Sequence, residues 1–180
     1  GLTDLSHPCQ ILADIMTIEE RAGDIAGKTI AWLGDGNNVC TSFIHAAEKL
    51  NFTLRIATPA NYAPRAQEVA AAKAAGAAVT VGIDARAAAA GADVVVTDTW
   101  VSMGDTDKDE RMAAFPPYAV DEHAMARAAK DAIFLHCLPA HRGEEVTDAV
   151  LDGPQSAVWD EAENRIHAQK AVLMWCLGKL

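Results

Sequence analysis

The side chains best suited to chemistry in this sequence are an imidazole and a thiol, His136 and Cys137, which stand next to each other. The four residues before His136 (132–135) are apolar and partly β-branched, which is typical of a buried strand, and Pro139 prevents that strand from continuing. The pair therefore lies at the carboxyl end of a predicted strand, where open α/β sheets bind their ligands. We expect other strands to bring further polar groups to the same edge.

Two other predicted strands lead into polar side chains. Strand 93–97 is followed by Asp98, and strand 29–33 runs through a glycine-rich turn to Asn37 and Asn38. If the strands are parallel, these groups and the thiol share one edge, which suits a small ligand with a cationic amine. An amine must lose a proton before it can act as a nucleophile, and a carboxylate beside a thiol can assist that step. A nucleophilic cysteine hydrolase is a rival interpretation, and an inert buried cysteine with a capping aspartate is the purely structural one.

Residues 7–22 predict an amphipathic helix with Pro8 in its first turn. Its apolar side chains fall mainly on one face, and we expect Asp14 on the opposite, charged face. His7 and Gln10 lie in or beside the first turn, where unpaired backbone N–H groups and the helix dipole favour an anion. Alternatively, His7 only caps the helix and Gln10 faces solvent.

A Gly-x-Gly turn, Gly34 to Gly36, separates a strand from a helix, as in dinucleotide-binding domains. Val39 occupies the third glycine position, however, and the next strand ends in Thr58-Pro59 without the acidic residue that would hold a ribose. The sequence therefore disfavours a nicotinamide-dependent oxidoreductase.

The remaining stretches are predicted to be scaffold. The alanine-rich stretch 64–91 is predicted to form a helix, a strand near 77–83 and a short helix. After it come a solvated charged helix face over 105–111, a helix over 121–130, a polar turn over 140–145 and a last helix over 160–177. Strands that alternate with helices, without a linker between them, predict one doubly wound α/β domain. In that fold a mainly parallel sheet has helices on both faces, a Rossmann-like arrangement of three layers.

Composition narrows the class of protein. The 180 residues are 51% hydrophobic and include 15 basic and 25 acidic side chains, for a net charge of −10. This acidic balance lacks the excess of positive charge that binds nucleic acid or an anionic membrane surface. A few local cations would still suffice to bind an anionic substrate. The cysteines have no paired spacing, and we find neither a signal peptide nor a membrane span, so we expect a reduced, cytoplasmic protein.

Several short segments occur in the order found in a known family. They are His7-Pro8-Cys9-Gln10, Asp35-Gly36-Asn37-Asn38, Asp98-Thr99-Trp100-Val101-Ser102-Met103-Gly104, His136-Cys137-Leu138-Pro139 and Glu163-Asn164-Arg165. Across essentially the whole chain this set resembles the aspartate/ornithine carbamoyltransferase family. The Ser-Met-Gly and His-Cys-Leu-Pro segments resemble its ornithine branch, because the aspartate branch usually has His-Pro-Leu-Pro at the latter position. The resemblance implies an arginine-biosynthetic transferase that makes citrulline and phosphate from ornithine and carbamoyl phosphate, without metal or organic cofactor.

The resemblance also implies roles for single residues. His7 and Gln10 would contact the carbamoyl group, and Arg165 would help to polarise its carbonyl oxygen. Cys137 and Leu138 would lie beside the carbamoyl group and the attacking amine. The tetrahedral oxyanion that forms would be stabilised by cationic and hydrogen-bonding donors.

On the acceptor side, the resemblance implies a carboxylate and thiol that act together. Asp98 with Cys137 would assist deprotonation of the ornithine side-chain amine. The residues that would hold ornithine are Asn38, Asp98, Ser102 and Met103.

One part of the family pattern is missing from this sequence. The family has an N-terminal carbamoyl-phosphate domain with a Ser-Thr-Arg-Thr motif, and its active unit is a homotrimer. We therefore expect residues 1–180 to be the ornithine-binding part only, nearly inactive alone, with terminal helices that would pack on the absent domain. The apolar sides of those helices, including Trp175, should be partly uncovered. A non-catalytic amino-acid-binding module and a carbamoyltransferase for putrescine or N-acetylornithine stay open as alternatives.

Overall fold

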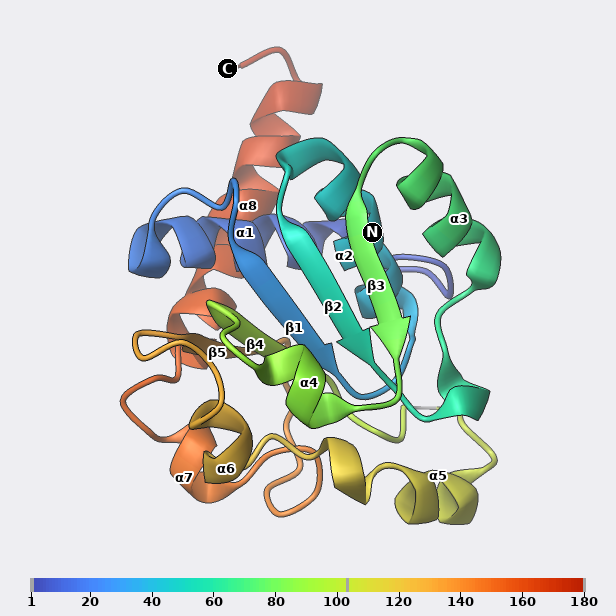
Figure 1. Ribbon diagram of the computed structural model, residues 1–180. Helices are drawn as coiled ribbons and strands as arrows, with labels where there is room; N and C mark the ends of the chain where they lie inside the picture. The colour runs from blue at the N-terminus through green and yellow to red at the C-terminus, as the bar shows by residue number, and fades with distance from the viewer. Residues whose placement is uncertain (1, 103, 180) are drawn as a thin grey trace.

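A parallel sheet forms the centre of the computed structural model, which describes residues 2–102 and 104–179 (Figure 1). The strands lie in the order β3-β2-β1-β4-β5, and every neighbouring pair is parallel. The predicted doubly wound α/β fold is therefore confirmed. The strands are β1 (Thr29–Leu33), β2 (Thr53–Ala57), β3 (Ala78–Gly82), β4 (Val94–Thr97) and β5 (Ile133–His136).

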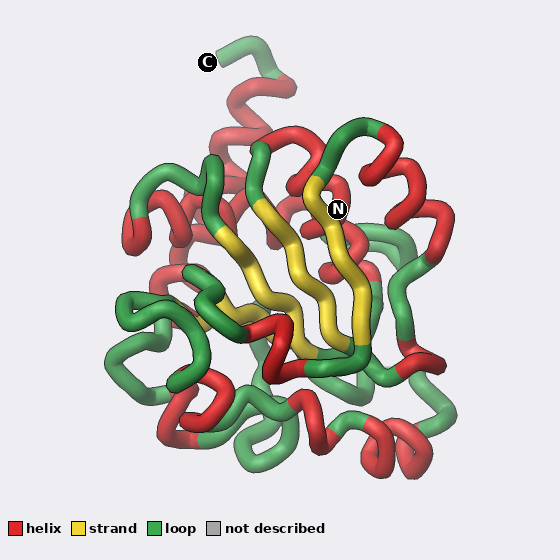
Figure 2. The backbone as a smooth tube through the Cα atoms, viewed as in Figure 1, coloured by secondary structure: helices red, strands yellow, loops and turns green. Residues whose placement is uncertain are grey.

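Helices cover both faces of this sheet, and the helical and extended segments alternate along the chain (Figures 1 and 2). One face carries α1 (Pro8–Ala22), α2 (Asn38–Leu50), α3 (Ala66–Ala74) and α8 (Val158–Cys176). On or near the other lie α4 (Ala85–Ala89), α6 (Glu122–Met125) and α7 (Asp148–Leu151), with α5 (Lys108–Ala114) beyond the strand ends and 3-10 turns at Ala60–Tyr62 and Pro116–Tyr118. The helix predicted over 121–130 is thus much shorter than expected, because turns follow Met125.

The alternation of side chains along each strand divides the core into two parts. Ile30 and Trp32 of β1 belong to the apolar cluster under α1 and α2, where they are fully buried. Leu33, Val95 and Phe134 point to the other face and belong to the cluster that includes residues of α4, α6 and α7. Burial of a large apolar side chain contributes roughly 1.5–3 kcal/mol, so each helical layer is held by side chains that the strands direct towards it.

The pairing of α1 with α8 changes the environment of one predicted solvent-facing residue. α8 crosses behind α1 (Figure 1), so a second face of α1 is covered in addition to the face on the sheet. Asp14 is consequently only 1% exposed, and its placement on a solvated face was wrong. Apolar side chains near the carboxyl-terminal half of α8 remain uncovered: Leu12 is 44% exposed and Trp175 is 72% exposed.

The winding of the chain reverses between β1 and β4. β2 and β3 are added on one side of β1, after which the chain returns to place β4 and β5 on the other. The carboxyl ends of β1 and β4 are therefore the topological switch point, where doubly wound sheets bind ligands. Among the described helices, none combines the length and apolarity needed to cross a membrane.

Candidate active site

The Asp98 carboxylate lies at the switch point, at the end of β4, and is 8% exposed. Its Oδ2 accepts a hydrogen bond from Asn37 Nδ2 at 2.7 Å. Its Oδ1 accepts one from the Cys137 thiol at 3.0 Å and one from the Thr99 backbone N–H at 2.7 Å. The structure thus brings together side chains that follow β1, β4 and β5, and we call Asn37, Asp98 and Cys137 the tip cluster.

Asn37 has two functions that the sequence did not separate. Its Oδ1 caps α2 by accepting bonds from two backbone N–H groups of the first turn, at 2.9 and 3.1 Å, while its Nδ2 binds Asp98. Both ends of the amide are used, so its orientation is fixed. Asn38, the predicted ornithine contact, donates from Nδ2 to the carbonyl oxygen of Thr3 at 2.7 Å. Sequence reasoning missed the contact between Asn37 and Asp98, although the N-cap position beside the tip of β1 was a usable signal.

The Cys137 thiol is arranged as a hydrogen-bond donor. Burial above all, and then the negative charge of Asp98, raises the pKa of this thiol well above its usual value. The thiol therefore keeps its proton at neutral pH and donates a hydrogen bond to the carboxylate. Because the thiolate is the nucleophilic form of cysteine, this environment disfavours a cysteine hydrolase.

The His136 ring is buried and forms its hydrogen bonds with Leu138 and Glu145 rather than with the tip cluster. Its fully buried ring accepts a bond at Nδ1 from the Leu138 backbone N–H at 2.9 Å, and Nε2 lies 3.2 Å from Oε1 of Glu145. Glu145 belongs to the predicted polar turn over 140–145, yet its side chain is 0% exposed. Ligand atoms of Asp98, His136 and Cys137 lie within 4.8 Å of one another, a donor set that could suit a metal. Each of these side chains is already hydrogen-bonded within the protein.

A second group of polar side chains lies between α1 and α8. Gln10 Nε2 donates to Asp14 Oδ1 at 2.7 Å and to Glu161 Oε1 at 2.8 Å, while Gln10 Oε1 accepts a bond from the Arg165 guanidinium. Gln10 is 1% exposed, so the alternative in which it faces solvent is wrong. We call Gln10, Asp14, Glu161 and Arg165 the helix network.

His7 lies where the tip cluster and the helix network approach each other. Its side chain makes no capping bond, and its buried Nδ1 has no hydrogen-bond partner among the described residues. Burial first, and then the positive charge of Arg165, lowers the pKa of His7, with the charge of Asp98 acting in the opposite direction. The imidazole is therefore neutral at pH 7, with a ring nitrogen left for a ligand.

The loop after Asp98 carries two further predicted ornithine contacts. Ser102 is exposed, and its backbone N–H donates to Asp105 Oδ2 at 2.7 Å. In the described part of the chain, no hydrogen bond joins the Ser102 hydroxyl to the tip cluster. Met103 lies outside the described residues.

Arg111 corrects the prediction that residues 105–111 form a solvated helix face. Its side chain is only 12% exposed and donates to Asp35 Oδ2 at 2.7 Å and Asp107 Oδ1 at 2.9 Å. It also binds the carbonyl oxygen of Trp100 at 3.0 Å. Arg111 therefore fixes the loop that follows Asp98 to the turn after β1, whereas the acidic residues beside it on α5 remain exposed.

The glycine-rich turn after β1 is closed to a phosphate. The Gly36 N–H donates to the Tyr62 carbonyl oxygen at 2.8 Å, and a Cβ added at Gly36 would lie 2.2 Å from the backbone nitrogen of Pro64. Glycine is required here because another segment of the chain packs on the turn. The structure thus gives a physical reason for the incomplete nucleotide motif.

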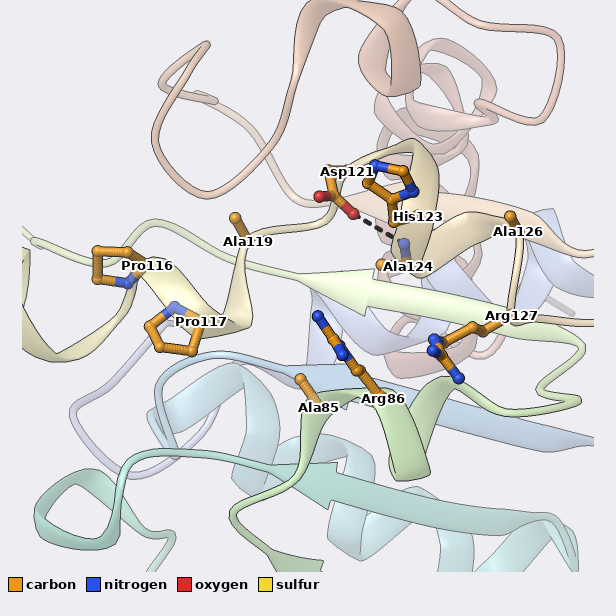
Figure 3. Close-up of a pocket in the computed structure, with 10 residues that line it drawn as sticks. All are labelled: Ala85, Arg86, Pro116, Pro117, Ala119, Asp121, His123, Ala124, Ala126 and Arg127. Atoms are coloured by element: carbon orange, nitrogen blue, oxygen red, sulfur yellow. Dashed lines mark hydrogen bonds between the residues drawn. The ribbon is translucent and has the colours of Figure 1, made fainter.

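The described residues also line a cavity and a groove that lie outside the tip cluster and the helix network. A cavity of about 580 Å³ between α4 and α6 is lined by Arg86, Arg127, Asp121 and His123 among others, and by none of the predicted site residues (Figure 3). An apolar groove of about 320 Å³ lies between α1 and α8. The groove is lined by Leu12, Met16, Ala168, Ala171, Val172 and Trp175.

Known proteins are similar to this chain in both sequence and fold. A curated ornithine carbamoyltransferase from Caulobacter vibrioides is 67% identical over 100% of this chain, and one from Rhodopseudomonas palustris is 61% identical over 99%. The structure of the Burkholderia thailandensis ornithine carbamoyltransferase superimposes with a TM-score of 0.89 at 50% identity, over 100% of this chain and 58% of that one. The Pyrococcus furiosus enzyme gives 0.91 at 47% identity, over 97% of this chain and 57% of that one.

The chain spans 58% and 57% of the lengths of the two curated relatives. The family described as "Aspartate/ornithine carbamoyltransferase, Asp/Orn binding domain" matches residues 26–176, which include the tip cluster and the two α8 residues of the helix network, Glu161 and Arg165. The chain therefore belongs to the aspartate/ornithine carbamoyltransferase family.

Proposed function

We propose that this chain is the ornithine-binding part of an ornithine carbamoyltransferase, which converts carbamoyl phosphate and L-ornithine into citrulline and phosphate. The observation that carries the proposal is the approach of the tip cluster to the helix network at His7. A carboxylate suited to a cationic amine lies near a neutral imidazole, a fixed amide and a guanidinium. The names of the similar proteins support the same reaction.

The tip cluster would receive the acceptor amine. Asp98 attracts the ammonium form, and the donors on Asn37 and Cys137 hold its carboxylate in one orientation. The amine attacks only after it has lost a proton, and Asp98 is placed to accept that proton. The amino-acid end of ornithine would be held by Asn38, Ser102 and Met103.

The helix network would receive the carbamoyl group. As the amine nitrogen bonds to the carbonyl carbon, negative charge develops on the carbonyl oxygen, where His7 and Arg165 can stabilise it. The bond from carbon to the phosphate oxygen then breaks, and phosphate leaves with the electron pair. Gln10 would hold the carbamoyl amide, and Leu138 would lie beside it.

The apolar groove between α1 and α8 would receive the rest of the longer protein. Its rim includes Leu12 and the 72% exposed Trp175, and uncovered apolar surface of this kind marks an interaction site. The relatives' greater length supports this occupant. We further propose a homotrimer in the cytoplasm, with no nucleic-acid or membrane partner.

The proposal is tested by citrulline formation. A fusion of this chain to the remaining segment of the Caulobacter vibrioides relative should make citrulline from L-ornithine. Its rate should be far higher than that of this chain alone. N-acetylornithine and putrescine, assayed for their own carbamoylated products, should react more slowly. A folded fusion that binds ornithine without turnover would instead support an amino-acid-binding module, and faster reaction with putrescine would overturn the choice of acceptor.

A further inference from the structure

Two buried carboxyl groups of the helix network face one amide group. Asp14 and Glu161 are each 1% exposed, and each accepts a hydrogen bond from the same nitrogen, Gln10 Nε2. The other oxygen of Glu161 accepts a hydrogen bond from the backbone N–H of His136 at 2.9 Å. Two carboxyl groups that meet at one nitrogen lie close enough to repel each other when both are charged, and a proton on one of them removes that repulsion.

The surroundings of the pair favour that proton. Burial chiefly raises the pKa of Asp14 to about 7, and burial together with the charge of Asp14 raises the pKa of Glu161 well above its usual value. Among the other charged or titratable groups that face the pair, Asp98 and the Cys137 thiol add no positive charge, and Arg165 is the cation. Two like charges cannot both be accommodated so close together in a dry interior.

The same bonds decide which way the Gln10 amide points. Because Asp14 and Glu161 both accept from Nε2, the oxygen Oε1 must face the opposite side, where the Arg165 guanidinium lies. If the amide were rotated by half a turn, its oxygen would face two acceptors and its NH₂ group would face the Arg165 cation. The side chains of Gln10, Asp14, Glu161 and Arg165 would then lose the hydrogen bonds that join them.

We propose that Asp14 and Glu161 share one proton and act as a positioning pair, which locks the Gln10 amide with its oxygen towards Arg165 and the reacting carbamoyl group. The kinetic part of this inference rests on the proposed function, whereas the shared proton does not. Neither residue touches substrate, so both act through Gln10.

The shared proton is tested by the stability of this chain. The native state holds this proton up to about pH 7, whereas the unfolded chain releases it near pH 3.8. Between these two values the native state therefore binds more protons than the unfolded chain. The free energy of unfolding consequently falls as the pH rises through this window. The urea midpoint of the unsubstituted chain should therefore fall more steeply between these pH values than that of the double variant Asp14→Asn/Glu161→Gln. Glu163→Gln, at an exposed position of α8, should keep the original slope. Equal slopes in all three proteins would refute the shared proton.

The positioning role is tested by kinetics in the fusion protein. Asp14→Leu leaves Gln10 without one acceptor and should raise KM for carbamoyl phosphate about tenfold with less effect on kcat, whereas Asp14→Asn, which still offers an oxygen, should restore KM to within about threefold. Equal KM values for the Leu and Asn variants would overturn the positioning role. A fusion without any transfer activity would refute the proposed function alone, and the stability slopes would still decide the shared proton.

Discussion

The tip cluster and the helix network both bury carboxyl groups, but they satisfy them in opposite ways. In the tip cluster a single carboxylate, Asp98, is surrounded by donors from Asn37, Cys137 and a backbone N–H. In the helix network two carboxyl groups share the NH₂ group of Gln10 and face each other. One region is built to present an anion and the other to retain a proton.

The difference matches the two chemical groups that the proposed reaction must bring together. A cationic amine needs an anion at the place where it binds and loses its proton. A carbamoyl group is neutral and needs a fixed pattern of donors and acceptors, which the proton-sharing pair supplies through Gln10. Substitutions in each region should therefore separate these two roles.

The largest effect is expected at the anion itself. Asp98→Asn keeps the size of the side chain but removes the charge and the proton acceptor, so kcat/KM for ornithine in the fusion should fall on the order of 10³-fold. Asp121→Asn is the matched control, because this residue caps α6 through a bond to the Ala124 N–H at 2.7 Å, away from the tip cluster. A loss below tenfold at Asp98 would contradict its role.

Removal of the shared amide should be costly for stability. Gln10→Leu leaves both carboxyl groups without their common donor in a buried site, and should lower the free energy of unfolding of this chain by about 3 kcal/mol. Urea denaturation measures the change. Gln169→Leu, at an exposed position of α8, should have little effect. Comparable losses in the two variants would show that the network does not depend on Gln10.

A smaller stability effect is expected at the ion pair that fixes the loop beside the tip cluster. Arg111→Ala leaves the 12% exposed carboxylate of Asp35 without its partner and should cost about 2 kcal/mol. Arg142, which is 41% exposed and pairs with Asp148 and Asp152, is the control, and its replacement by alanine should cost much less. Equal urea midpoints for the two variants would contradict the bracing role of Arg111.

The smallest effect concerns the thiol of the tip cluster. Cys137→Ser retains a donor to Asp98, whereas Cys137→Ala removes it, so we expect roughly a tenfold loss of kcat/KM for alanine and a smaller loss for serine. Iodoacetamide should label the exposed Cys176 first, and Cys137 only at a pH well above 9, because the pKa of its thiol is raised by burial and by Asp98. Rapid labelling of Cys137 at neutral pH would restore the nucleophile interpretation.

The residues of the tip cluster could be predicted from the sequence, whereas the two buried carboxyl groups of the helix network could not. The ends of strands 93–97 and 133–136 were visible as β-branched or apolar runs followed by Asp98 and Cys137, and parallel pairing brings such ends together. Asp14 follows the charged face of an amphipathic pattern, and only the arrival of α8 from the far end of the chain buries it. Arg111 was missed for the same reason, since its partner Asp35 belongs to a distant turn.

The most direct test of the account compares the two substrates in two variants of the fusion protein. Asp98→Glu displaces the anion of the tip cluster, and Gln10→Asn shortens the amide of the helix network. We expect the first to raise KM for ornithine and leave KM for carbamoyl phosphate nearly unchanged, and the second to do the reverse. If both variants changed both KM values equally, the division of the site into an acceptor region and a carbamoyl region would be wrong.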